Sequence, residues 1–228
     1  MPTFNWKELL TEWSQELLDS DSYSFYKTNL PSKVLANRWL GFPGASEEQI
    51  AQAEKRLGTG LPSSYREFLK VSNGWRKTTP FIDEIWSAEK IDWFPHCHQD
   101  WIDAWIEGAG GIYPVSDEEY FVYGSEQDAT NIRVEYLQTA LEISPPGDAA
   151  IYLLNPKIIN ADGEWEAWFF ANWLPGANRY PSFYEMMQEE HKIFLKLIEE
   201  NTGTKTNRRN PKSVSLTILE KLFRIFTR

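Results

Sequence analysis

The sequence contains little cysteine, no long hydrophobic run and no visible export signal. Cys97 is the single cysteine among 228 residues, which excludes an internal disulfide framework. The longest apolar stretch, residues 167–174, falls far short of the ~20 residues that a membrane-spanning helix needs. The first residues lack a basic segment followed by an apolar one, the pattern of a secretory signal. We therefore expect a soluble protein in the reducing environment of the cytoplasm.

The sequence also lacks the short motifs that mark common catalytic sites. It has no GxSxG elbow, HExxH helix, P-loop or GxGxxG fingerprint. Acidic residues gather at Asp162, Glu164 and Glu166, but we expect them to be solvated because they flank a predicted turn. We predict a protein that is not an enzyme and has no cofactor, and we keep a small-molecule enzyme as the third hypothesis.

One cluster of potential metal ligands is present, at His96, Cys97, His98 and Asp100. On an extended strand the HxH spacing places both imidazoles on one side and Cys97 on the other. A zinc ion would need two further ligands, and the third histidine, His191, is distant in the sequence. We predict no metal site here.

Basic charge is scarce outside the last residues. Residues 1–200 hold 16 Lys and Arg against 32 Asp and Glu, a net charge of −16, whereas residues 201–228 carry +6. An acidic body repels phosphate backbones, which argues against direct nucleic-acid binding. It attracts basic partners and accelerates their encounter. The alternative reading is that the charge serves solubility.

Helical signals occur near both ends of the chain. Apolar residues at helical spacing predict an amphipathic helix over 4–18. Ser46 and Gln49 form a capping-box pattern for a helix over 46–57 that ends at Gly58. A second helix starts at Pro62, and we expect Asn73 and Gly74 to adopt positive φ where it ends. A last helix covers about 181–200.

The middle of the chain reads as short strands separated by turn residues. The candidates are 112–115, 120–123, 137–143, 150–154 and 165–171, with a helix inserted over 99–107. Asp162 and Gly163 predict a tight turn between the last two strands. The expected fold class is α+β: a mostly antiparallel multistranded sheet flanked by an N-terminal helical hairpin and a C-terminal helix.

These signals divide the chain into four parts. Residues 1–45 form an N-terminal helix and an irregular lead-in, and 46–200 form the main domain. Residues 201–212 read as a basic linker and 213–228 as an amphipathic basic tail helix. Such a tail could dock on its own acidic domain, or make a weak contact with a partner or an anionic membrane.

The helical hairpin resembles the SUKH superfamily, the Smi/Knr-like group of cell-wall regulators and bacterial immunity proteins. The residues that carry the resemblance are Glu54, Leu57, Gly58, Leu61, Pro62, Tyr65, Phe68, Leu69, Asn73 and Gly74. Helix starts, stops and a buried face account for this motif, so we interpret it as architecture. The resemblance implies a SUKH-like fold and a binding role, which for many bacterial members is sequestration of a toxin.

An acidic and aromatic stretch is the candidate contact surface. We expect Asp117, Glu118, Glu119 and Tyr120 to meet a basic partner, with Trp75 as a further contact or as a buried wedge. The alternative for the acidic stretch is an ordinary solvated loop. The functional hypothesis is a non-catalytic immunity protein that binds a polymorphic or contact-dependent toxin. A regulatory scaffold for cell-wall or membrane-associated processes is the alternative.

Overall fold

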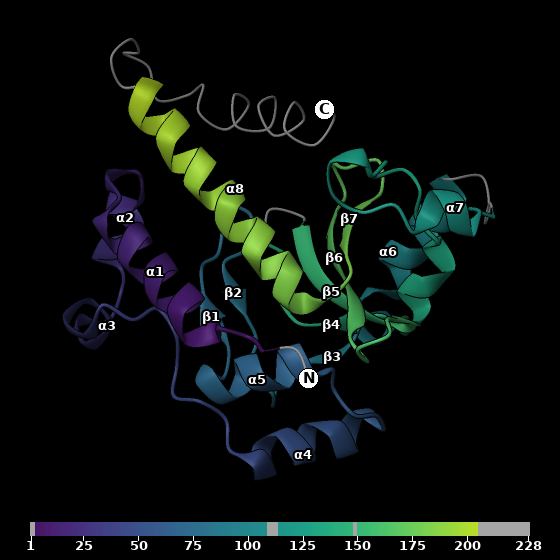
Figure 1. Ribbon diagram of the computed structural model, residues 1–228, viewed down its shortest axis with the longest axis horizontal. Helices are drawn as coiled ribbons and strands as arrows, with labels where there is room; N and C mark the ends of the chain where they lie inside the picture. Colours follow the sequence, from purple (N-terminus) through teal and green to yellow (C-terminus); the bar gives the residue numbers. More distant parts are fainter. Residues whose placement is uncertain (1–2, 109–113, 148–149, 205–228) are drawn as a thin grey trace.

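A five-stranded antiparallel sheet lies at the centre of the structure, in the order β3-β4-β5-β6-β7 (Figure 1). The structure is a computed structural model that describes residues 3–108, 114–147 and 150–204. The strands are β1 (Trp75–Arg76) and β2 (Glu84–Ile85), which form a separate pair, then β3 (Asp92–Trp93), β4 (Leu141–Glu142), β5 (Ala150–Ile159), β6 (Trp165–Ala171) and β7 (Ala177–Tyr180).

Helices precede, interrupt and follow these strands. They are α1 (Trp6–Asp19), α2 (Ser24–Thr28), α3 (Ser32–Asn37), α4 (Glu47–Leu57), α5 (Ser63–Val71), α6 (Phe94–Gly108), α7 (Asp117–Tyr120) and α8 (Phe183–Thr204). Short 3-10 turns cover Asp21–Tyr23, Gly124–Glu126 and Val134–Thr139. The predicted α+β class is confirmed, with helices on both sides of the sheet (Figure 1).

Strand β6 separates two hydrophobic cores. All seven of its residues are buried. Phe169 belongs to the cluster formed with α1, α5 and α8, whereas Trp168 and Phe170 belong to the cluster formed with α6 and α7. Successive side chains of a strand point to opposite faces. The sheet is therefore covered on both faces, and β6 has no solvent-facing side.

The helical hairpin α4–α5 forms as the sequence predicts, except where it ends. The Ser46 hydroxyl accepts from the Gln49 amide, the Gln49 side chain accepts from the Ser46 amide at 2.8 Å, and Gly58 is left-handed at φ 74°. Helix α5 ends on an extended Ser72, and of the pair expected to take positive φ, Gly74 does and Asn73 does not. The reason is that the Asn73 side chain makes a tertiary bond, accepting from the Ala88 amide at 2.8 Å.

Aromatic rings fix the hairpin against the terminal helices. The Phe183 ring of α8 lies 4.9 Å from Tyr65 and 5.2 Å from Phe68, centroid to centroid. Trp6 of α1 joins them at 5.3 Å from Phe68, and its indole donates to the Ser64 carbonyl at 2.9 Å. Helix α1 thus belongs to the same core as the motif-bearing hairpin.

Glu164, which directly precedes β6, caps the N-terminus of α5 although it lies 100 residues away from Ser64 in the sequence. Pro62 precedes the helix and offers no capping side chain. The Ser64 amide instead donates to Glu164 Oε1 at 2.9 Å, and the Ser64 hydroxyl donates to the other oxygen. The expectation of a solvated Glu164 is wrong, because the unpaired amides and positive dipole end of a helix N-terminus favour a carboxylate.

The strand predictions succeed for the main hairpin and fail around it. The turn with Gly163 at φ 79° joins β5 and β6 as expected. A strand over 120–123 is wrong: a Ser116–Glu119 capping box starts helix α7 and overrides the β-propensity of the aromatic residues. Of 137–143, only Leu141–Glu142 is strand. Residues 114–115 are not strand, and 112–113 lie outside the described residues.

Helix α8 continues through Thr204, four residues into the predicted linker. The predicted tail helix over 213–228 lies outside the described residues. Within the ranges that the structure covers, no helix is both long enough and apolar enough to cross a membrane.

A buried carboxyl group lies under α8. Glu190 is 2% exposed, accepts from the Tyr152 hydroxyl at 2.6 Å, and has the Tyr180 hydroxyl at 3.5 Å. Burial raises the pKa of Glu190 to about 7, against the hydrogen bonds from the two tyrosines, which lower it. Glu190 therefore holds its proton more tightly in the folded protein than a carboxyl group with the ordinary pKa of 4.5 does.

Stability should consequently fall as pH rises. A folded pKa near 7 lies above the ordinary value of 4.5, so the contribution is fully present below pH 4.5 and is lost as pH rises through 7. We expect Glu190→Gln to remove this pH-dependent loss of unfolding free energy, which is on the order of 1–3 kcal/mol at pH 8. Urea unfolding at pH 5 and pH 8 measures it. The control is Glu12→Gln, which alters an exposed carboxylate that is not among the groups acting on the pKa of Glu190. Equal pH dependence in wild type and Glu190→Gln would contradict the assignment.

Candidate functional site

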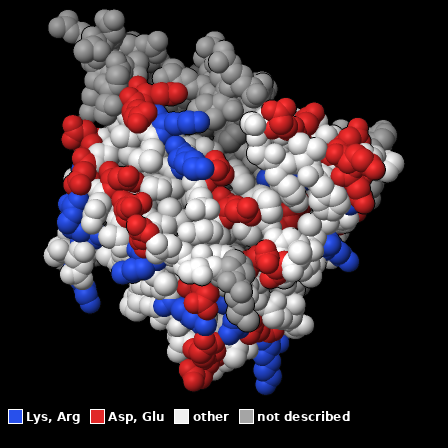
Figure 2. Space-filling view, in the orientation of Figure 1, with Lys and Arg blue, Asp and Glu red and all other residues white. Residues whose placement is uncertain are grey.

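Helix α7 presents a small acidic surface. Asp117, Glu118 and Glu119 are exposed, and the acidic side chains gather at the upper right of Figure 2, where Figure 1 places α7. The Ser116 hydroxyl accepts from the Glu119 amide at 3.2 Å, and the Glu119 carboxylate in turn accepts from the Ser116 amide at 3.3 Å. Phe121 follows the helix and is 44% exposed. Three carboxylates and one aromatic ring thus share this surface.

Arg133 ties α7 to the following segment. Its guanidinium donates to the Val115 carbonyl at 2.9 Å and forms an ion pair with Asp117. The same group lies 4.4 Å from the centroid of the Tyr120 ring. Asp117 is therefore partly neutralised, whereas the exposed Glu118 forms no salt bridge with any residue that the structure describes.

A buried carboxylate, Glu166 on β6, holds the inner side of α7. Glu166 Oε2 accepts from the Tyr120 hydroxyl and from the Trp168 indole, both at 2.6 Å, and Oε1 accepts from the Tyr123 hydroxyl at 2.8 Å. Burial, followed by the charge of Glu166, raises the pKa of Tyr120. Tyr120 therefore remains a hydrogen-bond donor, and the exposed helix is fixed to the sheet.

Arg179 on β7 completes this buried network. Its Nη1 lies 3.5 Å from Glu166 Oε1 and donates to the Tyr120 carbonyl. The guanidinium carbon lies 4.1 Å from the Tyr120 ring centroid, and Nε and Nη2 have no hydrogen-bond partner among the described residues. Arg179 is almost completely buried, so Glu166 supplies the carboxylate that compensates its charge.

The structure separates the predicted contact residues into two groups. Asp117, Glu118 and Glu119 are exposed together, but Tyr120 and Trp75 are fully buried. Tyr120 donates to Glu166. Trp75 belongs to the hydrophobic cluster on the opposite face of the five-stranded sheet, where its ring packs edge-on against Trp39 at 5.4 Å, centroid to centroid. Neither side chain has surface for a partner, so Tyr120 supports the site from below and Trp75 is a core residue.

The predicted ligand cluster lies on a helix rather than on a strand. His96, Cys97 and His98 belong to the first turns of α6, which is kinked at His98. His96 Nδ1 lies 3.0 Å from Asp92, and His98 Nε2 lies 3.2 Å from Glu142, so the two imidazoles face different carboxylates. Across residues 3–108, 114–147 and 150–204 no group of three potential ligands converges on one point.

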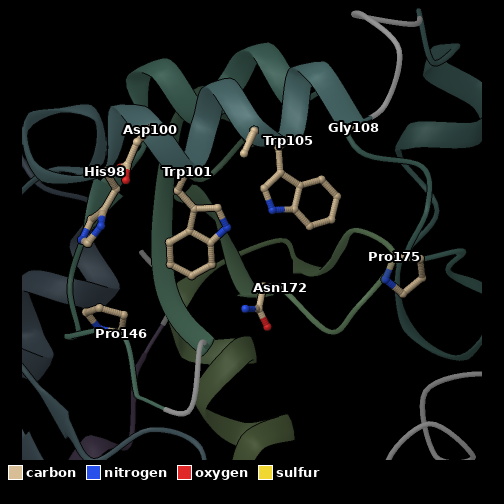
Figure 3. Close-up of a pocket in the computed structure, with 9 residues that line it drawn as sticks. His98, Asp100, Trp101, Trp105, Gly108, Pro146, Asn172 and Pro175 are labelled. Atoms are coloured by element: carbon tan, nitrogen blue, oxygen red, sulfur yellow. The ribbon is translucent and has the colours of Figure 1, made fainter.

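His98 borders a cleft of 820 Å³ between α6 and the β6–β7 connection (Figure 3). Its lining residues are His98, Asp100, Trp101, Ala104, Trp105, Gly108, Pro146, Asn172 and Pro175. Burial, then the charge of Asp92, raises the pKa of Glu142 to about 8, and burial lowers the pKa of His98. The Glu142–His98 pair therefore favours its neutral form. The sequence singled out His98 and Asp100, but nothing local predicted that Asn172 and Pro175 lie opposite them.

The antiparallel sheet, covered on both faces by the two hydrophobic cores, defines an α+β fold rather than an alternating α/β one. Residues 44–189, more than half of the chain, match the model of the SMI1 / KNR4 family (SUKH-1), and the protein belongs to this family. A comparison with curated proteins finds no match. The match begins two residues before the capping Ser46 and includes β6, α6 and α7.

The Glu166 network should dominate local stability. We expect Glu166→Ala to lower the free energy of unfolding by about 3–5 kcal/mol, because it leaves Arg179 buried without a carboxylate. Urea unfolding measures this loss. Glu118→Ala, which removes an exposed carboxylate, should change it by less than about 0.5 kcal/mol. The double variant Glu166→Leu, Arg179→Met removes both charges and should regain much of the lost unfolding free energy. A double variant no more stable than Glu166→Ala would contradict the compensation of Arg179 by Glu166.

Proposed function

We propose that this SUKH-1 domain binds a basic protein through the α7 surface and acts as an immunity protein that neutralises a toxin. The observation that carries the proposal is the exposed group Asp117, Glu118 and Glu119, mounted on a buried network. Family membership supports a protein-binding role over catalysis. The single cysteine supports a reducing, cytoplasmic site of action.

Charge supports the choice of a basic partner. Residues 1–200 carry a net charge of −16, and such a field raises the rate at which a basic protein meets this one. Once the proteins meet, local contacts decide affinity. Phe121, 44% exposed beside the carboxylates, supplies an apolar contact of the kind that anchors interfaces.

Rigidity supports the same conclusion. A four-residue helix such as α7 has no stability of its own, because helix nucleation is costly. Here Tyr120 is bonded to Glu166 from beneath and Arg133 clamps the helix start. The carboxylates are therefore positioned before binding, and little conformational entropy is lost when a partner arrives.

Charge reversal at Glu118 tests the proposal. We expect co-expression of the protein to protect cells from a toxin encoded beside its gene, and purified protein to bind that toxin. Glu118→Lys should weaken binding about tenfold, mostly through a slower association rate, and the difference should shrink at high salt. Surface plasmon resonance at 50 and 500 mM NaCl measures both effects.

The matched control is Glu12→Lys on α1, an exposed site that makes the same charge change on a different face. Equal weakening by both variants indicates a general charge effect and removes α7 as the contact. Absence of protection against every neighbouring toxin, with no stoichiometric partner recovered from the host, overturns the immunity role. A regulatory scaffold is then the alternative, and liposome flotation of the full chain and of residues 1–204 tests whether 205–228 acts as its tether.

A further inference from the structure

We propose that the cleft between α6 and the β6–β7 connection receives an arginine side chain of the protein partner. This inference rests on the proposed function and names a second contact for the same partner. The cleft is lined by the indoles of Trp101 and Trp105, by the carboxylate of Asp100 and by Asn172 from the opposite wall (Figure 3).

Both indoles hang from α6 toward the opposite wall of the cleft (Figure 3). Trp101 and Trp105 are partly exposed and are backed by Phe170, whose ring lies 5.4 Å and 5.0 Å from theirs. Phe170 is fully buried on β6. The indoles are thus supported on one side and open on the other, which is the arrangement in which a ring face can take a ligand.

The charges around the cleft select a cation. Asp100 is exposed at its edge, and α6 carries no lysine or arginine. The lining residues include no lysine or arginine, and the lowered pKa of His98 keeps that imidazole neutral near pH 7. Gly108, the last residue of α6, brings the negative end of the helix dipole to the cleft.

Among cations, a guanidinium matches these walls best. Tryptophan is the strongest cation–π partner, and arginine stacks on aromatic faces while its planar donors bond a carboxylate. The carboxylate of Asp100 and the side-chain amide of Asn172 both line the cleft and offer acceptor oxygens. At 820 Å³ the cleft also has room for residues that flank the arginine, beside Pro146 and Pro175.

The location suits a partner that also meets α7. Trp101 and Trp105 pack on the same hydrophobic cluster as Tyr120, the residue that anchors α7. Helices α6 and α7 therefore cover one face of the sheet, on the right of Figure 1. The α7 carboxylates attract the basic surface of the partner, and one arginine of that surface stacks on the indoles in the cleft.

Titration of the full chain with the peptide acetyl-Gly-Arg-Gly-amide tests the proposal. NMR follows the indole N–H signals, assigned with Trp101→Phe and Trp105→Phe. We expect the arginine peptide to shift both signals and to bind about fivefold to tenfold more tightly than its citrulline analogue, a neutral isostere. Asp100→Asn should weaken binding about threefold, and the matched control Asp103→Asn, an exposed site on the same helix outside the cleft, should not.

Equal binding of the citrulline peptide overturns the proposal, because the cleft then recognises neutral groups. Stronger shifts from maltohexaose, a neutral sugar with the same capacity to stack, overturn it as well. Should neither peptide move the indole signals while Glu118→Lys still weakens toxin binding, the cleft inference fails and the proposed function stands. Should the peptide bind as expected while no protein partner is found, the immunity role fails and the cation site stands.

Discussion

Two carboxylates at the start of β6 connect the layers of this protein. Glu164 caps the N-terminus of α5, and two residues later Glu166 collects the donors of Tyr120, Tyr123 and Trp168 beside Arg179. Both are buried. A buried carboxylate costs free energy unless its oxygens are hydrogen-bonded or paired with a charge. Because Glu164 accepts from Ser64 of α5 and Glu166 accepts from Tyr120 of α7, these bonds tie both helices to the strand.

The family motif and the candidate binding surface are built on different hydrophobic cores. Tyr65, Phe68 and Leu69 of the motif pack with α1 and α8, whereas α6 and α7 cover the cluster around Trp168 and Phe170. The helix starts, stops and apolar face of the hairpin build the scaffold. Trp101 and Trp105 of α6 and Tyr120 of α7 belong to the second cluster, whereas the motif residues Tyr65, Phe68 and Leu69 belong to the first. This division allows the surface to vary between members of a family while the hairpin keeps its shape.

Aromatic residues serve three purposes here. Trp6, Trp13 and Trp75 are fully buried and fill the larger core. Tyr120 and Tyr152 are equally buried but use their hydroxyls to bond the carboxylates Glu166 and Glu190. Trp101 and Trp105 keep part of their surface in the cleft. The amino-acid composition cannot distinguish these three roles, because it carries no information on the neighbours of each ring.

The sequence alone determined the elements whose signals are local. The hairpin around Ser46 and Gly58, the amphipathic helix α1 and the β5–β6 turn at Gly163 were all predictable, because caps, glycine conformations and apolar spacing act within a few residues. Tertiary structure decided the rest. The burial of Glu164 and Glu166, the inward position of Tyr120 and the pairing of α6 with the β6–β7 connection depend on groups tens of residues apart. Their energies arise from desolvation and long-range contacts, which no local pattern records.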